Sequence, residues 1–440
     1  MKIKLFKNFF CFILKYYYIS KSSNQILTCN NSGELAFQCT IAKKQFFYSV
    51  FLRSLLPIRY IIKNSFLASK MQELKCVDDG SILSIYSTLN QKKSIDAVSD
   101  GNKILSVTLT KGLDADYFST LNLWKSSMAL PFIYIYLFVI SIFDVGFLTT
   151  KKLFSSSGDK MILALFYYVK FYCFFLKNRP GLIFVANDHS PEIRSIILAA
   201  KEFNIKTAYI QHSSVSKFFP DINVFDIAFL DGKQSLDVYN SISPLQECTP
   251  YITGAIRLVN LKEHNQMRVI ENRVNIAIND TLSIDGLKEL ILSAKNKFPV
   301  DCVFYIRLHR QQTNRKQILN LCKIMGVLIS DSSNNIFDFL SRSRYLITVS
   351  SGIVLDALRN NVLPLLYIEP DTIDFFDFVE NDIAIDISCF SYCECDYSNS
   401  LKKLQLNAKY FDQLIGEDSV VVFKKIAEVN SILLSSSSEL

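Results

Sequence analysis

Glycine and proline are scarce in this chain of 440 residues, which contains only 13 and 10 of them. Collagen-like and linker-like proteins need far more of both, so these classes are excluded. Half of the residues are hydrophobic and a fifth are charged, which is typical of a globular protein with ample core material. The length exceeds what a single core supports and predicts two large lobes.

Paired cysteines are also lacking. Eleven cysteines are scattered from Cys11 to Cys395 without the spacing of a small disulfide scaffold, which indicates a reducing compartment. The tightest group, Cys389, Cys393 and Cys395, has three sulfurs and no histidine nearby. We therefore expect ordinary thiols there rather than a metal site, and we expect no metal or other cofactor elsewhere.

Acidic residues are nearly absent from the first 70 residues, which hold eleven Lys and Arg but only Glu34 as an acid. This segment carries +10, and the remainder carries about −3, because the whole chain carries +7. Basic residues interleaved with aromatic and aliphatic ones, as between Lys2 and Lys21, predict a surface that rests on anionic lipid headgroups. A solvated basic face over a buried helix is the alternative. Nucleic acid is not an expected partner, since no recognised binding motif is present.

No apolar run reaches the roughly 20 residues that a helix needs to span a bilayer. The run from Ala129 to Phe143 has fifteen residues, and the run from Met161 to Leu176 is broken by Lys170. We expect both to form buried or membrane-resting helices. Residues 5–14 imitate the core of a signal peptide, but no small-residue cleavage site follows, so export is not expected. These features predict a cytoplasmic protein that is peripheral on the inner membrane.

From about residue 180, short β-branched or aromatic runs alternate with helical stretches, a pattern typical of βαβ units and a parallel sheet. A polar stretch over 255–270 predicts the boundary between an N-terminal lobe, 1–260, and a C-terminal lobe, 261–440. Ligands bind beyond the carboxyl ends of parallel strands, so residues directly after each strand are the candidates for a site. The expected strands are 181–186, 207–211, 226–230, 251–253, 274–278, 302–308 and 345–349, and the expected helices are 191–203, 283–297, 314–325 and 335–341.

Three small residues, Ser350, Ser351 and Gly352, follow the strand at 345–349 and precede a helix. Backbone N–H groups and the helix dipole at such a turn point at an anion, which predicts a phosphate site. An ordinary turn with serine N-caps is the alternative. Glu369, at the end of the next strand, is a candidate acceptor of hydrogen bonds from a ribose or sugar hydroxyl.

A second basic group is expected on the same rim. Arg307, His309 and Arg310 lie at the carboxyl end of the strand at 302–308. Arginine binds phosphate oxygens through two parallel hydrogen bonds, and a protonated histidine donates one more. With the serine turn, these residues predict a clamp for the phosphate of a nucleotide.

Acid and base candidates occur in the first half of the chain. Asp78 and Asp79 precede Gly80 and follow the strand-like stretch 74–77, so a carboxylate there is a candidate base for an acceptor hydroxyl. A plain Asp-Asp-Gly turn is the alternative. Asp188, helped by His189, is the competing base. Three of the four histidines, His189, His212 and His309, follow expected strands, and His264 lies in the charged boundary segment.

The stretches ANDHSPE, YIQHSS, FDIAFLDGK and YITGAI, between Gly181 and Gly254, resemble the middle of GT-B glycosyltransferases that build bacterial capsules and O-antigens. They are also similar to the wider group that contains CDP-glycerol glycerophosphotransferases and UDP-GlcNAc 2-epimerases. Bacterial sialyltransferases of that group carry an acidic-acidic-Gly, a His-Pro and a Ser-Ser motif. Here Asp78-Asp79-Gly80, His309 and Ser350-Ser351 stand in the same order, with Arg310 in place of the proline.

This resemblance implies an α/β fold of the GT-B type, with two Rossmann-like lobes and a cleft between them. It implies that Asp78 or Asp79 is the general base, that His309 binds or protonates the donor phosphate and that the serines hold this phosphate. The implied reaction is a metal-independent, inverting transfer from a nucleotide sugar to a lipid-linked or growing lipopolysaccharide, O-antigen or capsule glycan. The donor would be CMP-sialic acid or a related nonulosonic acid, or else a UDP-sugar. A CDP-glycerol-type polyol-phosphate transferase and a non-catalytic assembly protein of the same pathway are the alternatives.

Overall fold

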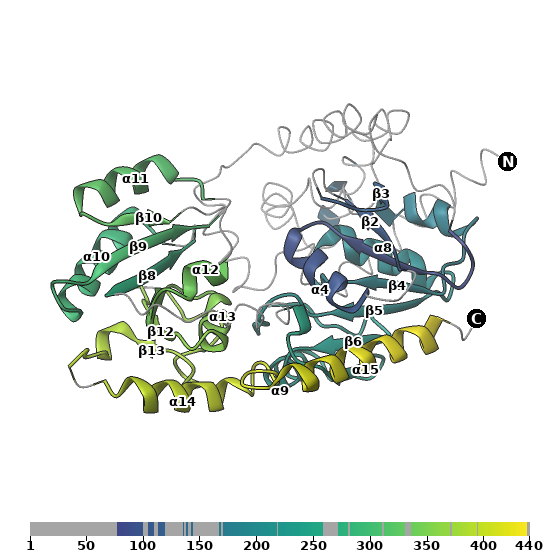
Figure 1. The fold of residues 1–440 in the computed structure, drawn as a ribbon. Helices are drawn as coiled ribbons and strands as arrows, with labels where there is room; N and C mark the ends of the chain where they lie inside the picture. The colour runs from purple at the N-terminus through teal and green to yellow at the C-terminus, as the bar shows by residue number, and fades with distance from the viewer. Residues whose placement is uncertain are drawn as a thin grey trace.

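Two parallel sheets, each with helices packed on it, form two lobes in the computed structural model of the chain (Figure 1). This arrangement confirms the predicted two-lobed α/β fold. The structure describes residues 77–99, 104–109, 113–118, 135, 138–139, 142–143, 167–168, 170–217, 219–257, 272–279, 282–309, 312–330, 336–369, 372–393 and 395–437.

The first sheet has the strand order β3-β2-β1-β4-β5-β6-β7, and every neighbouring pair is parallel. The chain builds outward from β1 in one direction and from β4 in the other, so the order reverses between these two strands. The expected strands from residue 181 onward are confirmed here, whereas β1 to β3 were not predicted. The strands are β1 (Ile82–Tyr86), β2 (Ile104–Thr108), β3 (Tyr117–Phe118), β4 (Leu182–Val185), β5 (Lys206–Ile210), β6 (Ile227–Leu230) and β7 (Thr249–Ile252).

The second sheet has the order β10-β9-β8-β11-β12-β13 and is likewise parallel throughout. Its order reverses between β8 and β11. The fold therefore has two topological switch points, one in each lobe. The strands are β8 (Arg273–Ile278), β9 (Val303–Leu308), β10 (Leu328–Ser330), β11 (Tyr345–Thr348), β12 (Leu363–Leu366) and β13 (Ile385–Asp386).

Side-chain caps fix where several helices begin. Ser190 accepts a hydrogen bond from the N–H of Ile193 at the start of α8, and Ser283 accepts one from Gly286 at the start of α10. Each cap follows a loop at the carboxyl end of a strand. The helices that matter below are α4 (Leu89–Ser99), α8 (Pro191–Lys201), α9 (Lys233–Ile242), α10 (Ile284–Lys297), α11 (Arg315–Ile324), α12 (Ile336–Leu340), α13 (Ile353–Arg359), α14 (Tyr397–Ala408) and α15 (Ser419–Ser437).

Both faces of each sheet are covered, so central strands are buried along their whole length. All four residues of β4 are buried, as are all four of β11. This burial explains why these strands read as continuous hydrophobic runs rather than as alternating patterns. Described residues of the run from Met161 to Leu176, including Tyr167, Phe171 and Phe175, pack into the core of the first lobe. This part of the run is a buried helix, as expected.

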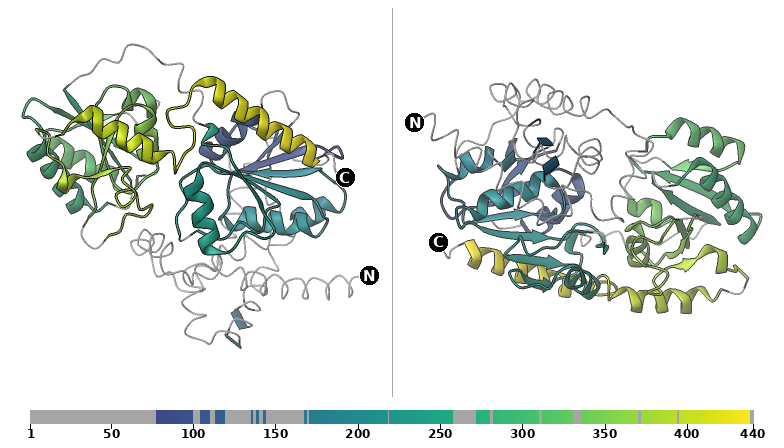
Figure 2. Two further views of the ribbon diagram at one scale, coloured as in Figure 1. Left: turned by 90° about the horizontal axis from the view of Figure 1, so that it is seen from below. Right: turned by 180° about the vertical axis from the view of Figure 1, so that it is seen from behind.

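The C-terminal helix α15 crosses back to the first lobe, although residues 261–440 were expected to form a single lobe. Figures 1 and 2 show α14 beside the second sheet and α15 beneath the first. Val422, Val429 and Leu433 of α15 belong to a core cluster with Ile82 and Phe184 of the first sheet. Burial of these apolar side chains against the first sheet explains the position of α15.

Two glycines allow this crossing segment to approach the first lobe. A Cβ atom added to Gly232, before α9, would lie 2.5 Å from backbone atoms of Phe411. Gly254, after β7, has a φ of +79°, and an added Cβ would collide with the side chain of Leu414. Only glycine fits at either position without displacing the backbone.

Several expectations fall outside the described residues. They concern the basic N-terminal segment 1–70, most of the run from Ala129 to Phe143, and His264 and Arg310. The expected lobe boundary falls largely within 258–271, which is also outside them. Among the helices that the structure describes, none is long and apolar enough to cross a membrane.

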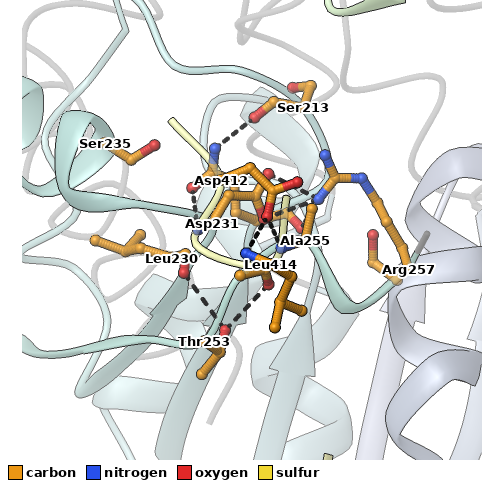
Figure 3. Close-up of polar contacts among 12 residues, drawn as sticks. Ser213, Leu230, Asp231, Ser235, Thr253, Ala255, Arg257, Asp412 and Leu414 are labelled. Carbon is orange, nitrogen blue, oxygen red and sulfur yellow. Dashed lines mark hydrogen bonds and ion pairs between the residues drawn. The ribbon is translucent and has the colours of Figure 1, made fainter. Parts of the chain in front are cut away.

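Asp412 joins the two lobes through a fully buried carboxylate. Its Oδ1 accepts from the N–H of Ala255 at 2.9 Å and of Leu414 at 3.1 Å (Figure 3). Its Oδ2 accepts from Nε of Arg359, at the end of α13, at 2.6 Å. Ala255 belongs to the first lobe and Arg359 to the second. One charge therefore fixes the linker 409–416 to both.

We expect Asp412→Ala to lower the free energy of unfolding by about 3–5 kcal/mol, because it leaves the largely buried guanidinium of Arg359 without its partner. Urea titration monitored by circular dichroism measures this loss. The matched control is Lys403→Ala, which breaks an ion pair with Asp382 whose side chains are 65% and 64% exposed. It should cost less than about 1 kcal/mol. Equal losses in the two variants would contradict the role given to Asp412.

Candidate active site

The two switch points carry polar residues of the kind that a substrate site needs. In the first lobe, the loop 187–190 follows β4 beside β1 and contains Asp188 and His189. In the second lobe, the turn 350–352 follows β11 beside β8. Open parallel sheets bind ligands beyond the carboxyl ends of their strands at such reversals. Both loops are therefore placed where the fold favours a site.

The carboxyl edges of the two sheets face one another. A Cβ atom added to Gly352, after β11, would lie 3.5 Å from Oγ of Ser214, after β5. Lys217 of the first lobe pairs with Asp377 of the second at 3.7 Å. Phe375, which follows β12, is 7% exposed and belongs to the core cluster of the first lobe. Loops from both edges thus meet at the junction of the lobes.

Asp188 and His189 form a hydrogen-bonded pair at this junction. Oδ1 of Asp188 lies 2.9 Å from Nδ1 of His189, and the carboxylate is fully buried while the imidazole is 27% exposed. The side chain of Asn187 accepts from the N–H groups of His189 and Ser190 and so holds the loop tightly. The carboxylate therefore orients a ring that reaches solvent.

Burial by itself raises the pKa of Asp188, but the charge and hydrogen bond of His189 and the hydroxyl of Tyr239 outweigh burial. The pKa of this carboxyl lies below its ordinary value. Asp188 is consequently ionised at neutral pH and accepts hydrogen bonds with both oxygens. It acts on His189 as a fixed negative charge.

His212, after β5, stacks on His189 with ring centroids 6.2 Å apart. Burial, together with the charges of His189 and Arg257, lowers the pKa of His212 to about 3. Its ring is neutral at physiological pH. Nδ1 of His212 and the hydroxyls of Ser214 and Ser216 are buried without a hydrogen-bond partner in the described part of the chain. Leaving buried polar groups without hydrogen bonds costs folding free energy, and a bound polar molecule would supply the missing hydrogen bonds.

A second buried pair lies beside this segment and was not predicted. Nη1 of Arg257, after β7, donates to Oδ1 of Asp231, after β6, at 2.8 Å and to the carbonyl of Gln211 at 3.2 Å (Figure 3). Burial raises the pKa of Asp231 to about 7, against the neighbouring charge of Arg257. The sequence carried a signal that could have found Asp231, which directly follows β6, whereas Arg257 comes later, in the loop after β7.

Asp78 and Asp79 lie at the opposite edge of the first sheet, which corrects the expectation that they face the other lobe. They are exposed and precede β1, and the carbonyl of Asp78 accepts from the N–H of Ser81 in a turn. Gly80 adjoins Gly181 at the start of β4. The length of these strands separates the two edges by roughly 15 Å. The plain-turn alternative describes this motif.

One residue of the serine turn 350–352 in the second lobe, Ser350, is already hydrogen-bonded within that lobe. The hydroxyl of Ser350 donates to Asp374 at 3.1 Å and accepts from the N–H of Phe375 at 2.9 Å, so it holds the loop after β12. Ser351 and Gly352 come directly before α13, and Gly352 faces Ser214 of the first lobe. Ser351 and Gly352 are therefore the residues of this turn that remain candidates for binding a phosphate.

The other predicted residues of this lobe lie along the same carboxyl edge as the serine turn. Arg307 is the last residue but one of β9, and β8 separates β9 from β11. The guanidinium of Arg307 lies 5.6 Å from the ring centroid of Phe339. His309 follows on the same edge and is exposed. Glu369 accepts from the N–H and hydroxyl of Ser283, at the start of α10. Its carboxylate anchors this helix, in contrast to the expected sugar contact.

The cysteine group near the C-terminus consists of free thiols, with Cys389 and Cys393 exposed and Cys395 partly buried. Across the residues described, no three His, Cys, Asp or Glu side chains are grouped so as to hold a metal ion. The chemistry at the junction described above is that of an Asp-His pair, hydroxyls and arginine.

The pH dependence of stability tests the surroundings of His212. The folded chain keeps this ring neutral with a pKa of about 3, whereas the unfolded chain titrates it near the ordinary 6.5. Between these values the unfolded state binds more protons. Stability from this residue is present above pH 6.5 and falls below it by up to about 1.4 kcal/mol per pH unit.

We expect His212→Gln to flatten the fall of the unfolding free energy between pH 7 and pH 5 in urea titrations. His309→Gln, which alters an exposed ring, is the matched control and should keep the original slope. If His212→Gln also keeps that slope, the folded chain does not hold His212 neutral.

Comparisons with known proteins identify the fold. No protein-family profile and no curated protein matches the chain. A structure from Listeria monocytogenes, provisionally assigned as a UDP-N-acetylglucosamine 2-epimerase, has a TM-score of 0.51 and 13% identity over 81% of this chain and 97% of that one. The UDP-GlcNAc 2-epimerase of Neisseria meningitidis, bound to UDP-GlcNAc, has a TM-score of 0.46 and 16% identity, covering 81% and 100%. MurG of Acinetobacter baumannii has a TM-score of 0.40 and 10% identity, covering 81% and 99%. The chain has a two-lobed fold of the GT-B type, as the resemblance in its sequence implied.

Proposed function

We propose that the protein is a glycosyltransferase that moves a sugar from a nucleotide donor to a hydroxyl of an acceptor glycan. One observation carries the proposal: a buried carboxylate paired with a solvent-reaching imidazole lies at one switch point, and this edge meets the other lobe's switch point across the junction. The proposal takes this imidazole as the base and the turn at 350–352 as the site of the donor phosphate.

His189 is the general base in this proposal. With its Nδ1–H donating to Asp188, the lone pair of the ring is on Nε2. Nε2 takes the proton of the acceptor hydroxyl while the hydroxyl oxygen bonds to the anomeric carbon of the donor. The bond from that carbon to the phosphate oxygen breaks, and the nucleotide leaves with the electron pair. Asp188 stabilises the imidazolium that forms.

The leaving phosphate is assigned to Ser351 and Gly352, whose backbone N–H groups precede α13, with Arg307 on the same edge. Backbone N–H groups and a guanidinium stabilise the negative charge that grows on the departing oxygen. Ser350 shapes this turn through Asp374. His309 remains a candidate second donor, because it follows Arg307 on that edge.

Donor and acceptor classes come from the sequence resemblance. CMP-linked nonulosonic acids and UDP-sugars are the first donors to test, and lipopolysaccharide, O-antigen or capsule glycans are the proposed acceptors. Asp78 and Asp79 lie away from the junction, so one of the three sialyltransferase-like motifs does not contribute to the site. We therefore give CMP-linked nonulosonic acids no preference over UDP-sugars as donors. A lipid-linked acceptor at the inner leaflet fits the +10 charge of the first 70 residues.

A donor screen tests the proposal. The purified chain is incubated with CMP-, UDP- and GDP-sugars and with CDP-glycerol, and nucleotide release is measured with and without acceptor glycan. We expect acceptor-dependent release from one class of nucleotide sugar. Turnover of CDP-glycerol alone would instead assign a polyol-phosphate transferase. Inertness toward every donor would favour a non-catalytic assembly protein.

With the active donor, His189→Ala should lower kcat about 100- to 10,000-fold, because the acceptor proton loses its base. KM for the donor should change little, since the phosphate sits on the other lobe. Asp78→Asn and Asp79→Asn form the control and should retain the rate, because both residues lie at the far edge of the sheet. The assignment fails if the aspartate variants are inactive and His189→Ala is not.

A further inference from the structure

Both oxygens of the Asp188 carboxylate are engaged, and by residues from different elements. Oδ1 faces Nδ1 of His189 at 2.9 Å, and Oδ2 accepts from the hydroxyl of Tyr239, in α9, at 2.6 Å. Asp188 and Tyr239 are both fully buried. Tyr239 therefore cannot touch a substrate, but it contacts the group that orients His189.

The hydroxyl of Tyr239 has a fixed direction. Asp188 is ionised and can only accept, so Tyr239 must donate to it. The hydroxyl of Tyr209 lies 3.5 Å from that of Tyr239, and Tyr209 is consequently the donor in this second contact. Burial, followed by the charge of Asp188, raises the pKa of both tyrosines well above the ordinary value. The two tyrosine hydroxyls therefore keep their protons at neutral pH.

Other charged or titratable groups face Asp188 from every element packed around it. Arg194 of α8 donates to the backbone carbonyl of Asp188 at 3.0 Å, and its own charge is shared with Asp221, 3.8 Å away. His212 is neutral and adds little charge. Among the described residues, the hydroxyl of Tyr239 is thus the one side-chain donor to Oδ2 of Asp188. The groups facing Asp188 are His189, Arg194, Tyr209, His212 and Tyr239.

We propose that Tyr239 is a positioning residue that sets the proton affinity of His189 through Asp188. The inference rests on the proposed function, in which His189 is the base. By holding Oδ2, Tyr239 fixes the plane of the carboxylate so that Oδ1 meets Nδ1 of the ring. It also draws negative charge away from Oδ1, which keeps the imidazolium from being held too strongly for the ring to act as a base.

Removal of the Tyr239 hydroxyl should raise the pH at which His189 becomes protonated. Without it, Asp188 concentrates its charge on Oδ1 and holds the protonated ring more tightly. The active form, a neutral ring beside an ionised carboxylate, is therefore lost at a higher pH. A hydrogen bond to a charged group is strong enough to move this midpoint by about one pH unit.

The experiment compares the unaltered chain with Tyr239→Phe by NMR titration of the histidine rings. The chain has only four histidines, so His189 can be assigned by single replacements. We expect the midpoint of the His189 titration to rise by about one pH unit in Tyr239→Phe. The acid limb of kcat/KM should move upward by the same amount. Tyr86→Phe, which also removes a buried hydroxyl of the first lobe, is the matched control and should shift neither.

Tyr209→Phe provides a second test should Tyr239→Phe fail to fold. It removes the donor behind Tyr239 and should shift the midpoint in the same direction by a smaller amount. Unchanged His189 midpoints in both folded variants would overturn the inference, whatever the activity. A raised midpoint without any transfer would uphold the inference and refute the proposed function, because the titration does not depend on turnover.

Discussion

The buried carboxylate of Asp412 is the interaction on which the arrangement of the two lobes depends. It accepts hydrogen bonds from Ala255 on one side and from Arg359 on the other, and the segment that follows leads into α15 on the first sheet. A buried charge tolerates little displacement of its partners, because each lost hydrogen bond exposes an uncompensated charge. The facing of the carboxyl edges follows from this constraint.

The two edges that meet there differ in chemistry. The first offers the fixed negative charge of Asp188 and the ring of His189, which can exchange a proton, and its buried hydroxyls suit neutral, polar groups. The second offers backbone N–H groups and an arginine, which favour an anion. An acceptor hydroxyl and a donor phosphate therefore suit opposite edges. The bond that is made and the bond that is broken would lie between the lobes.

Sequence patterns predicted what is local. Most strands from residue 181 onward, and the placement of Asp188, His189 and His212 after them, follow from the alternation of apolar runs and helices. The short edge strands β10 and β13 were not predicted. The prediction that Asp78 and Asp79 face the other lobe was wrong. A turn flanked by apolar stretches has the same sequence pattern whether it precedes or follows a strand. Tyr239 meets Asp188 across 51 residues and Asp412 meets Ala255 across 157, and no local pattern reports such contacts.

A crystal structure of the chain with a non-transferable analogue of the active nucleotide sugar tests the central claim most directly. The account predicts that the phosphates lie against the backbone N–H groups of Ser351 and Gly352. The anomeric carbon should then face His189 across the junction, with room between them for an acceptor hydroxyl. Phosphates bound elsewhere, or an anomeric carbon turned away from His189, would contradict it.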